Sequence, residues 1–205
     1  MFNRIRGYLE NWVYAHRAQW TARRIAPFVN VGDRVLDVGA GDCQLDEILR
    51  HRSGCEVVAV DVTDSNRTSD SVILYDGQRL PFADKSFDVV LLIFVLHHTS
   101  DPGTVLEEAQ RVSRTRIIAF EDINKTWWDR ITFRVFHRWL KWSRNIDRPF
   151  HEWSPKQWSA LGKLSNLHEH FCQPLGRQLS YFASRHVGFV WHKEACDQAT
   201  TTKSA

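Results

Sequence analysis

The feature that most constrains the fold is a short apolar run followed at once by two glycines. Residues 34–38 have the composition of a buried strand, and Gly39 and Gly41 follow them. Behind the glycines, apolar residues at 45, 48 and 49 recur with helical spacing. Strand, glycine turn and helix in this order form the first unit of a nucleotide-binding α/β fold. The N–H groups at the start of the helix then face a polar or anionic ligand.

The pattern around these glycines narrows the class of nucleotide that could bind. A dinucleotide fingerprint, G-x-G-x-x-G, would need glycine at position 44, where the chain has Gln44. The chain instead reads D-x-G-x-G, starting with Asp37. A second apolar run, 56–61, ends in Asp61, about 20 residues past the glycines, where an acid binds ribose hydroxyls. This favours adenosine with an unmodified ribose; the alternative is a surface acid that caps the next turn.

Composition places the chain among single-domain globular proteins. Of its 205 residues, 43% are hydrophobic and 25% are charged, and the net charge of +3 is too small to indicate nucleic acid by itself. The four cysteines are scattered without C-x-x-C pairs, which predicts reduced thiols and no metal site. No apolar run approaches the roughly 18 residues of a membrane span, and no signal peptide is evident, so we expect a cytoplasmic protein.

Residues 1–30 form a predicted N-terminal helical cap. Apolar and aromatic residues recur on one face, including Trp12, His16 and Trp20, and the stretch is rich in arginine, with Glu10 its only acid. We expect this helix to pack on the sheet edge and over the mouth of the cofactor site. A mitochondrial presequence and a helix lying on a membrane surface are the alternatives.

Specific motifs lie between residues 72 and 112. The block D-G-Q-R-L-P-F-A-D-K-S-F-D-V-V starts at Asp76, V-L-H-H ends at His98, Pro102 follows, and L-E-E-A-Q-R-V ends at Val112. Together with D-x-G-x-G, these motifs resemble class I S-adenosylmethionine-dependent methyltransferases akin to those that methylate ubiquinone and menaquinone precursors. The resemblance covers about residues 33–122. It implies one Rossmann-like α/β domain with a seven-stranded, mostly parallel sheet, helices on both faces and an antiparallel C-terminal strand.

The resemblance also implies which residues contact S-adenosylmethionine. The glycine turn would lie beside the methionine part, Asp61 would hold the ribose, and Asp76 with the backbone of Gly77 would bind the adenine amino group. The complete set carried over is Asp37, Gly39, Ala40, Gly41, Asp61, Val62, Asp76, Gly77, Ile93, Phe94 and His97.

The chain also departs from the family pattern. Ile93 stands where Asn or Asp is frequent, and residues 114–116 replace the usual glycine turn. The crossover at 63–71 is polar without helical spacing, so we expect a loop there. Neither an N-P-P-Y motif nor a Pro-Cys pair is present, which argues against DNA as the substrate.

The segment 123–150 is a predicted lid-like insertion, because it concentrates tryptophans and basic residues after the strand at 117–122. A lid over an apolar acceptor competes with a helix packed on the sheet edge, and contact with RNA or an anionic membrane surface stays open. A helix is expected over 155–164 and strands near 169–174 and 187–191. The single domain would span 1–193, followed by a disordered tail over 194–205.

The predicted reaction is transfer of the sulfonium methyl group to a small apolar or aromatic molecule. Candidate catalytic residues are His98, Asp122 and His151, because they follow strand ends or lie at the end of the lid, and histidine titrates near neutral pH. An RNA methyltransferase and a non-catalytic cofactor-binding module are the alternatives. The oligomeric state and the methylated atom stay open.

Overall fold

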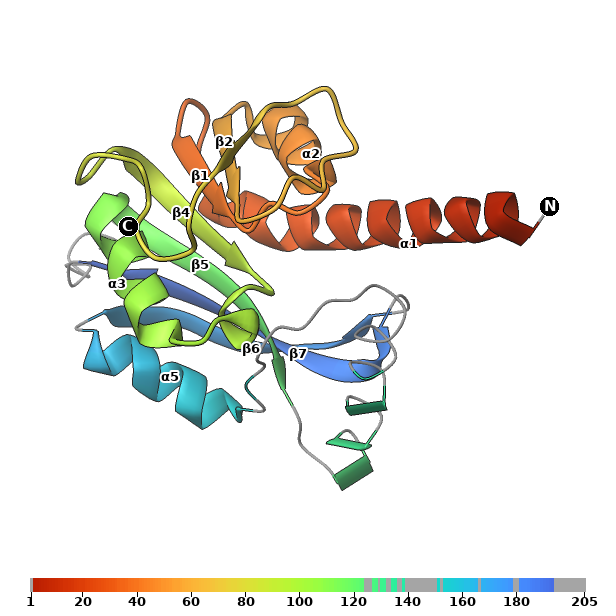
Figure 1. Ribbon diagram of the computed structural model, residues 1–205. Coiled ribbons are helices and arrows are strands. Elements are labelled where there is room, and N and C mark those ends of the chain that lie inside the picture. The colour runs from red at the N-terminus through yellow and green to blue at the C-terminus, as the bar shows by residue number, and fades with distance from the viewer. Residues whose placement is uncertain are drawn as a thin grey trace, which may run out of the picture.

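Seven strands form one sheet whose order places β4 at the centre, with β1 beside it. The computed structural model describes residues 2–123, 127–128, 130–131, 134–135, 138, 151, 153–165, 167–178 and 181–193; side chains are described from residue 12 onward, apart from 13 and 176–184. Figure 1 shows the sheet at the centre of the molecule, with strands in the order β3-β2-β1-β4-β5-β7-β6.

The strands are β1 (Arg34–Val38), β2 (Glu56–Asp61), β3 (Val72–Leu74), β4 (Phe87–Ile93), β5 (Ser113–Ile123), β6 (His168–Gln178) and β7 (Tyr181–His192). The α-helices are α1 (Phe2–Ile25), α2 (Gln44–Ser53), α3 (Pro102–Val112) and α5 (Pro155–Leu164). Short 3-10 turns, η1 (Ala26–Phe28) and η2 (Leu96–His98), follow α1 and β4.

The pairing of the strands confirms the predicted mixed sheet. Strands β1 to β5 pair with one another in parallel. Strand β7 is antiparallel to both β5 and β6, which lie on either side of it. Because β1 and β4 run side by side at the centre, their carboxyl ends create the crevice in which ligands bind in open α/β sheets.

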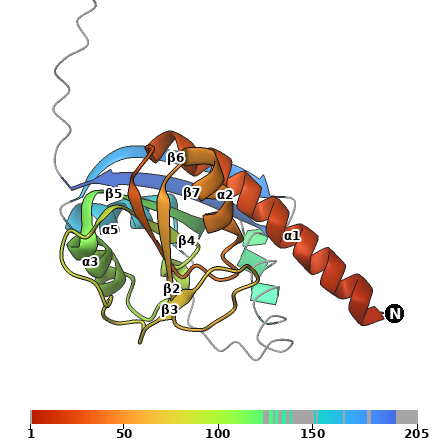
Figure 2. The ribbon, with the colours of Figure 1, turned by 90° about the horizontal axis from the view of Figure 1, so that it is seen from above.

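Alternate residues of the central strands enter two separate cores. Val35 and Val89 pack against α1 and α2, whereas Leu36 and Val90 pack against α3 and α5. Figure 2 shows these helices on the two sides of the sheet. Burial on both faces explains why the central strands read as unbroken apolar runs.

The predicted core-facing side of α1 is wrong at Trp12 and His16. His16 is exposed and Trp12 is 52% exposed, whereas Ala18, Ala22 and Ile25 are buried. Small side chains on this face let the helix approach α2 and the sheet closely. Of the predicted rings, Trp20 packs against this core, whereas Trp12 and His16 stay outside. The N-terminal half of α1 projects beyond the sheet (Figure 1).

Several boundaries differ from the prediction. Strand β4 ends at Ile93, before the V-L-H-H motif, because Phe94 turns to a φ of +59°. Strand β5 begins at Ser113, directly after α3, so no glycine turn is needed there. Strands β6 and β7 extend beyond the predicted 169–174 and 187–191 because they pair with each other along most of their length.

Other local predictions are confirmed. Residues 62–71, all of them described, form no helix. Helix α5 begins at Pro155 behind a capping box made by Ser154 and Gln157, and ends at Leu164. Most of the predicted lid at 123–150, including Trp139 and Trp142, and all of the predicted tail at 194–205 lie outside the described residues. Among the described helices, none has the length and apolarity needed to cross a membrane.

Candidate functional site

The glycine turn after β1 is fixed against the end of β2. The N–H of Gly39 donates to the carbonyl of Val60 at 2.7 Å, and Gly39 and Gly41 have φ of +74° and +58°. A Cβ on Gly39 would lie 2.6 Å from Cγ2 of Val95, whereas one on Gly41 would meet nothing closer than 3.9 Å. The protein's own packing therefore requires glycine at 39, and the backbone at 41 leaves room for a ligand.

A cavity lies beside this turn, and α1 forms one of its walls. Residues from α1, from the turn and from the end of β4 line it, among them Tyr14, Arg17, Thr21, Asp37, Gly41 and Ile93. The N-terminal helix thus covers the predicted cofactor mouth. Ala40, from the predicted cofactor set, also lines the cavity.

Asp37 brings a buried carboxyl group to the cavity. It is 2% exposed, and its Oδ1 has no hydrogen-bond partner among the residues that the structure describes. Burial, and then the neighbouring Asp46 carboxyl group, hold the pKa of Asp37 well above its usual range. Burial raises the pKa of Asp46 to about 6. A cationic ligand group at this position would supply both the missing donor and the missing charge.

Asp61 connects the end of β2 to the glycine turn. Its Oδ2 accepts from the N–H of Gly41 at 2.9 Å, and its Oδ1 accepts from the N–H of Thr63 at 3.0 Å. The residue is 6% exposed. A carboxylate has about four acceptor sites, so these two bonds fix its orientation and leave capacity for hydroxyl donors.

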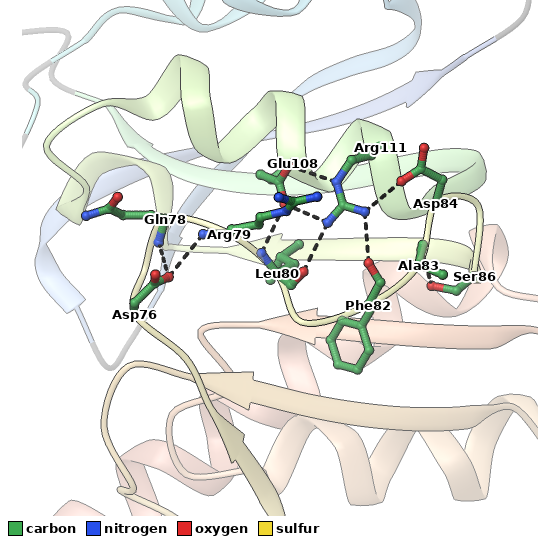
Figure 3. Close-up of polar contacts among 10 residues, drawn as sticks. All are labelled: Asp76, Gln78, Arg79, Leu80, Phe82, Ala83, Asp84, Ser86, Glu108 and Arg111. Atoms are coloured by element: carbon green, nitrogen blue, oxygen red, sulfur yellow. Dashed lines mark hydrogen bonds and ion pairs between the residues drawn. The ribbon is translucent and has the colours of Figure 1, made fainter.

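Asp76 and Gly77 follow the neighbouring strand β3. Oδ1 of Asp76 accepts from the N–H groups of Gln78 at 2.8 Å and Arg79 at 3.0 Å (Figure 3). These bonds lower the pKa of Asp76, so its carboxylate is ionised at neutral pH. A Cβ on Gly77 would lie 3.1 Å from Cγ1 of Val62, so these two predicted cofactor residues contact each other.

The loop after Asp76 is held by a guanidinium clamp from α3 (Figure 3). Arg111 donates to the carbonyls of Leu80 at 3.0 Å and Phe82 at 2.8 Å. It also pairs with Asp84 at 2.8 Å and Glu108 at 2.7 Å, and these carboxylates raise its pKa. The L-P-F block and the E-x-x-R helix, separate motifs in the sequence, are thus two sides of one interaction.

His97 lies buried behind the end of β4. Its Nδ1 is 2.5 Å from Oε2 of Glu121 on β5, and Oε1 of Glu121 accepts from the N–H of Leu96 at 2.8 Å. Burial opposes a charge on His97, yet Glu121 and then Asp122 raise its pKa above the ordinary value. The ring therefore fixes the chain after β4 to the end of β5.

Asp122 lies between two imidazole rings. Its Oδ1 is 2.7 Å from Nδ1 of His186, which faces it on β7, and its Oδ2 is 3.8 Å from Nε2 of His97. Burial would favour the neutral acid, but the hydrogen bond with His186 and the charge at His97 hold the pKa of Asp122 well below its usual range. The carboxyl group is therefore ionised.

The other two predicted catalytic residues lie beside this cluster. The ring of His98 is tilted against that of His97, with 4.0 Å between centroids. Nε2 of the His151 ring is 3.0 Å from the carbonyl oxygen of Thr99. The backbone N–H of His151 donates to the carbonyl of His97 at 2.9 Å. The structure thus brings Asp122 and His98 to one cluster, and His151 to its edge. A catalytic role for each of them stays a prediction.

Phe94 separates the cavity from this cluster. It has a φ of +59°, which is unusual for an aromatic residue. The guanidinium of Arg17, which lines the cavity, lies 4.5 Å from the Phe94 ring centroid. The ring of His186 is 5.0 Å from Phe94 in an edge-on arrangement. Phe94 therefore contacts the cavity wall with one part of its ring and the buried histidine with another.

Sequence reasoning missed Arg17, Glu121 and His186. Arg17 belongs to the arginine-rich helix, where its spacing from Ala18 and Thr21 could have indicated a covered face. Glu121 precedes the predicted Asp122 and was read as part of a strand. His186 faces Asp122 across the β5–β7 pairing, 64 residues further along the chain, and no local motif marks it.

Comparisons with known proteins agree with this geometry. A family model described as a methyltransferase domain matches residues 36–116. The ubiquinone/menaquinone biosynthesis C-methyltransferase UbiE of Xylella fastidiosa is 31% identical over 151 residues, which are 61% of this chain and 59% of that protein. UbiE of Stenotrophomonas maltophilia is 30% identical over 132 residues, or 55% and 52%. The chain thus spans between half and three fifths of the length of these relatives.

Solved structures share the fold at low sequence identity. The methyltransferase in a complex with the Haloferax volcanii Trm112 methyltransferase activator aligns with a TM-score of 0.68 and 19% identity, over 93% of this chain and 94% of that one. A SAM-dependent methyltransferase from Aquifex aeolicus aligns with a TM-score of 0.59 and 17% identity, over 81% and 85%. At such identities the likeness concerns the fold alone.

Proposed function

We propose that the chain is a class I S-adenosylmethionine-dependent methyltransferase, which its similarity to the methyltransferase domain model and to UbiE supports, and that it methylates a small apolar or aromatic molecule. The curated relatives are named as C-methyltransferases of quinone biosynthesis, which supports a ring-shaped acceptor. The surroundings of the cavity support it as well, because Trp20 and Phe94 both stand edge-on to the His186 ring.

The observation that carries the proposal is that the cavity presents Asp37 and the glycine turn, and that Asp61 bonds to the same turn from the end of β2. The Asp37 Oδ1 without a partner fits the ammonium of the methionine moiety. The backbone at Gly41 leaves open space beside it. Asp61 would accept from the ribose hydroxyls, and Asp76 with the Gly77 backbone would bind the adenine amino group, as the sequence resemblance implies.

Arg17 completes the methionine end in this proposal. Its side chain comes from α1 and lines the same cavity as Asp37 and the glycine turn. A guanidinium there suits the carboxylate of the methionine moiety, because it is always charged and can donate two parallel hydrogen bonds. The ammonium and the carboxylate of the cofactor would then face Asp37 and Arg17, respectively.

The cofactor supplies a methyl group on a sulfonium, which is already a good leaving group. The protein's contribution is therefore to align the acceptor and to exclude water. Ile93 and Phe94, at the end of β4, lie between the cofactor residues and the buried cluster. They would position the acceptor against the methyl group.

The segment after β5 stays a predicted lid. Its described residues include Trp127 and Trp128, each 59% exposed, whose rings stack with 3.8 Å between centroids. Exposed stacked rings indicate a surface that binds something apolar. An acceptor, an anionic membrane surface or RNA would each fit the arginines nearby, and the experiment below separates the acceptor types.

The test is transfer of label from methyl-labelled S-adenosylmethionine. The purified protein is incubated separately with 1,4-dihydroxynaphthalene, with indole and with an RNA transcript, and the labelled product is identified by mass spectrometry. We expect label in the aromatic molecules. Label in RNA alone would replace this proposal by the RNA methyltransferase alternative, and cofactor binding without transfer to any acceptor, including cell extract, would favour a non-catalytic module.

A further inference from the structure

A buried imidazole–carboxylate pair lies at the acceptor end of the sheet, beyond the residues of the proposed cofactor site. His186 on β7 and Asp122 on β5 face each other in the strand register, with 2.7 Å between Nδ1 and Oδ1. They are 1% and 8% exposed. A carboxylate that holds the Nδ1 side of a buried histidine is the arrangement by which enzymes orient a general base.

The hydrogen bond fixes which nitrogen of His186 carries a proton. Asp122 is ionised, since hydrogen bonding with His186 and the charge at His97 lower its pKa against the effect of burial. An ionised carboxylate can accept but not donate. Nδ1 of His186 therefore donates, and in the neutral ring Nε2 carries the lone pair. This nitrogen can take up a proton, and Asp122 then faces the imidazolium that forms.

The surroundings of the ring suit an aromatic acceptor. Trp20 stands edge-on to His186 with 5.9 Å between centroids, and Phe94 does so at 5.0 Å. Ile93, the neighbour of Phe94, lines the cofactor cavity. An acceptor ring entering between Trp20 and Phe94 would have the cofactor methyl group on one side and the imidazole on the other. Because His186 is 1% exposed, this entry requires the Phe94 ring to move aside.

We propose that His186 is the general base that takes the proton of a hydroxyl group on the acceptor, and that Asp122 positions it. The inference rests on the methyl-transfer function proposed above and adds the residue that takes the proton. It assigns the acceptor's proton to a residue inside strand β7. The sequence had instead suggested His98, after a strand, and His151, at the end of the predicted lid. Asp122, predicted from the sequence as a catalytic residue, acts here through the imidazole.

The step balances with the cofactor as the sole co-reactant. The hydroxyl O–H bond breaks, its proton moves to Nε2 of His186, and its electron pair enters the ring system of the acceptor. The oxygen or a ring carbon conjugated with it then bonds to the methyl carbon. The methyl–sulfur bond breaks with its electrons going to sulfur, which becomes a neutral thioether. Where carbon attacks, loss of the ring hydrogen as a proton restores the aromatic ring, and the oxygen regains a proton.

Several charged groups surround the imidazole of His186. Asp122 contacts it from β5, and Glu121 lies next to Asp122 and pairs with His97. Arg17 of α1 reaches over Phe94, which touches the His186 ring. Arg185 is its neighbour on β7.

The test measures single-turnover methyl transfer to 1,4-dihydroxynaphthalene between pH 5 and 9. Replacement His186→Gln removes the base, and His170→Gln is the matched control, because His170 is an exposed histidine on the adjacent strand β6. General-base catalysis contributes about 100- to 10,000-fold. We expect His186→Gln to lower the rate at neutral pH by at least about 100-fold, to lose the fall in rate toward acid pH, and to keep its cofactor affinity.

The outcomes separate this inference from the function on which it rests. Transfer by the His186→Gln variant at the wild-type rate and with the wild-type pH profile overturns the role of His186 but leaves the methyltransferase function standing. Absence of transfer by the wild-type protein with bound cofactor overturns the acceptor class and the base together. A loss of rate in His170→Gln equal to that in His186→Gln would also contradict the assignment.

A second measurement applies even where the buried substitution prevents folding. Nitrogen-15 NMR of histidine-labelled wild-type protein reports which ring nitrogen of His186 carries the proton. We expect a proton on Nδ1 in the neutral ring, and Asp122→Asn should change the tautomer and reduce the transfer rate. A neutral ring with its proton on Nε2 in the wild-type protein would overturn the proposal, because that nitrogen could then accept nothing.

Discussion

The two halves of the site are assembled in different ways. The cofactor half consists of the carboxyl ends of β1, β2 and β3, where backbone groups and single carboxylates follow each strand. Gly39 follows β1, Asp61 ends β2 and Asp76 lies just beyond β3. The Asp61 carboxylate bonds to the glycine turn. Contiguous motifs therefore specify this half, because each functional group is close in sequence to the strand that positions it.

The acceptor half joins residues far apart in the chain. His97 follows β4, Asp122 ends β5 and His186 belongs to β7, so the cluster forms only when the sheet is complete. Its groups are side chains buried together, and their charges depend on one another. The comparison shows that local motifs report the cofactor, while the groups that select the acceptor depend on tertiary packing.

The largest effect on the cofactor half is expected from Gly39→Ala. A Cβ there would lie 2.6 Å from Val95 at a φ of +74°, so packing strain adds to backbone strain of about 1–2 kcal/mol. We expect cofactor affinity to fall about 100-fold or more, as measured by calorimetry. Gly32→Ala is the matched control, because Gly32 has a φ of +80° with nothing within 4 Å. Equal losses in the two variants would refute the packing argument.

Removing the Arg111 clamp should affect the fold more than the acceptor half. Arg111→Ala leaves two carbonyls and two carboxylates without their shared donor. We expect the free energy of unfolding to fall by about 3 kcal/mol in urea titrations. Arg114→Ala, which removes an exposed ion pair with Asp88, should cost less than about 1 kcal/mol. If Arg111→Ala were as stable as Arg114→Ala, the loop after Asp76 would not depend on Arg111 for its stability.

Asp46→Asn should stabilise the protein. In the folded state burial raises the pKa of Asp46 from 3.8 to about 6. The folded state then holds a proton that the unfolded state releases, so stability falls as pH rises between these values and the penalty is complete above about 6. The amide removes this penalty, on the order of 2 kcal/mol at neutral pH. Thermal unfolding at pH 4 and pH 8 checks it: a variant no more stable than wild type at pH 8 would contradict the prediction.

The smallest effect concerns protons released on cofactor binding. Burial and Asp46 raise the pKa of Asp37 in the ligand-free protein, and an ammonium placed beside it would lower that pKa. Binding should therefore release a proton, and affinity should rise with pH by at most about tenfold per unit. Calorimetry in buffers of different ionisation enthalpy measures this release. If the heat of cofactor binding below neutral pH did not depend on the buffer, no proton would be released. The ammonium of the cofactor would then not lie beside Asp37.

The sequence predicted the fold well because its strongest signals are periodic and local. The strands at 34–38 and 56–61, the loop crossover at 63–71 and the capped helix from Pro155 all agree with the structure. The face of α1 was mispredicted, because hydrophobicity favoured the large rings at Trp12 and His16, whereas close packing selected small residues such as Ala22.

Only the cofactor half of the site could be predicted from the sequence. Asp37, Asp61 and Asp76 follow from spacing after strands and from the family motifs. His186 could not be found in this way, because its partner Asp122 is 64 residues away and the pairing of β7 with β5 must be known first. Arg17 lies within a helix that the sequence predicted. The direction of its side chain, however, depends on which face of α1 meets the sheet.

The central claim is that the cavity beside the glycine turn binds S-adenosylmethionine, and calorimetric titration tests it most directly. The account predicts binding of S-adenosylmethionine and its demethylated product in preference to NAD and ATP. Removal of a charge-assisted hydrogen-bond partner costs roughly 1.5–3 kcal/mol, so Asp61→Ala should weaken binding about 10- to 100-fold, while Asp64→Ala, at an exposed acid in the following loop, should not. No heat with S-adenosylmethionine, or an Asp61→Ala variant that binds like wild type, would contradict the account.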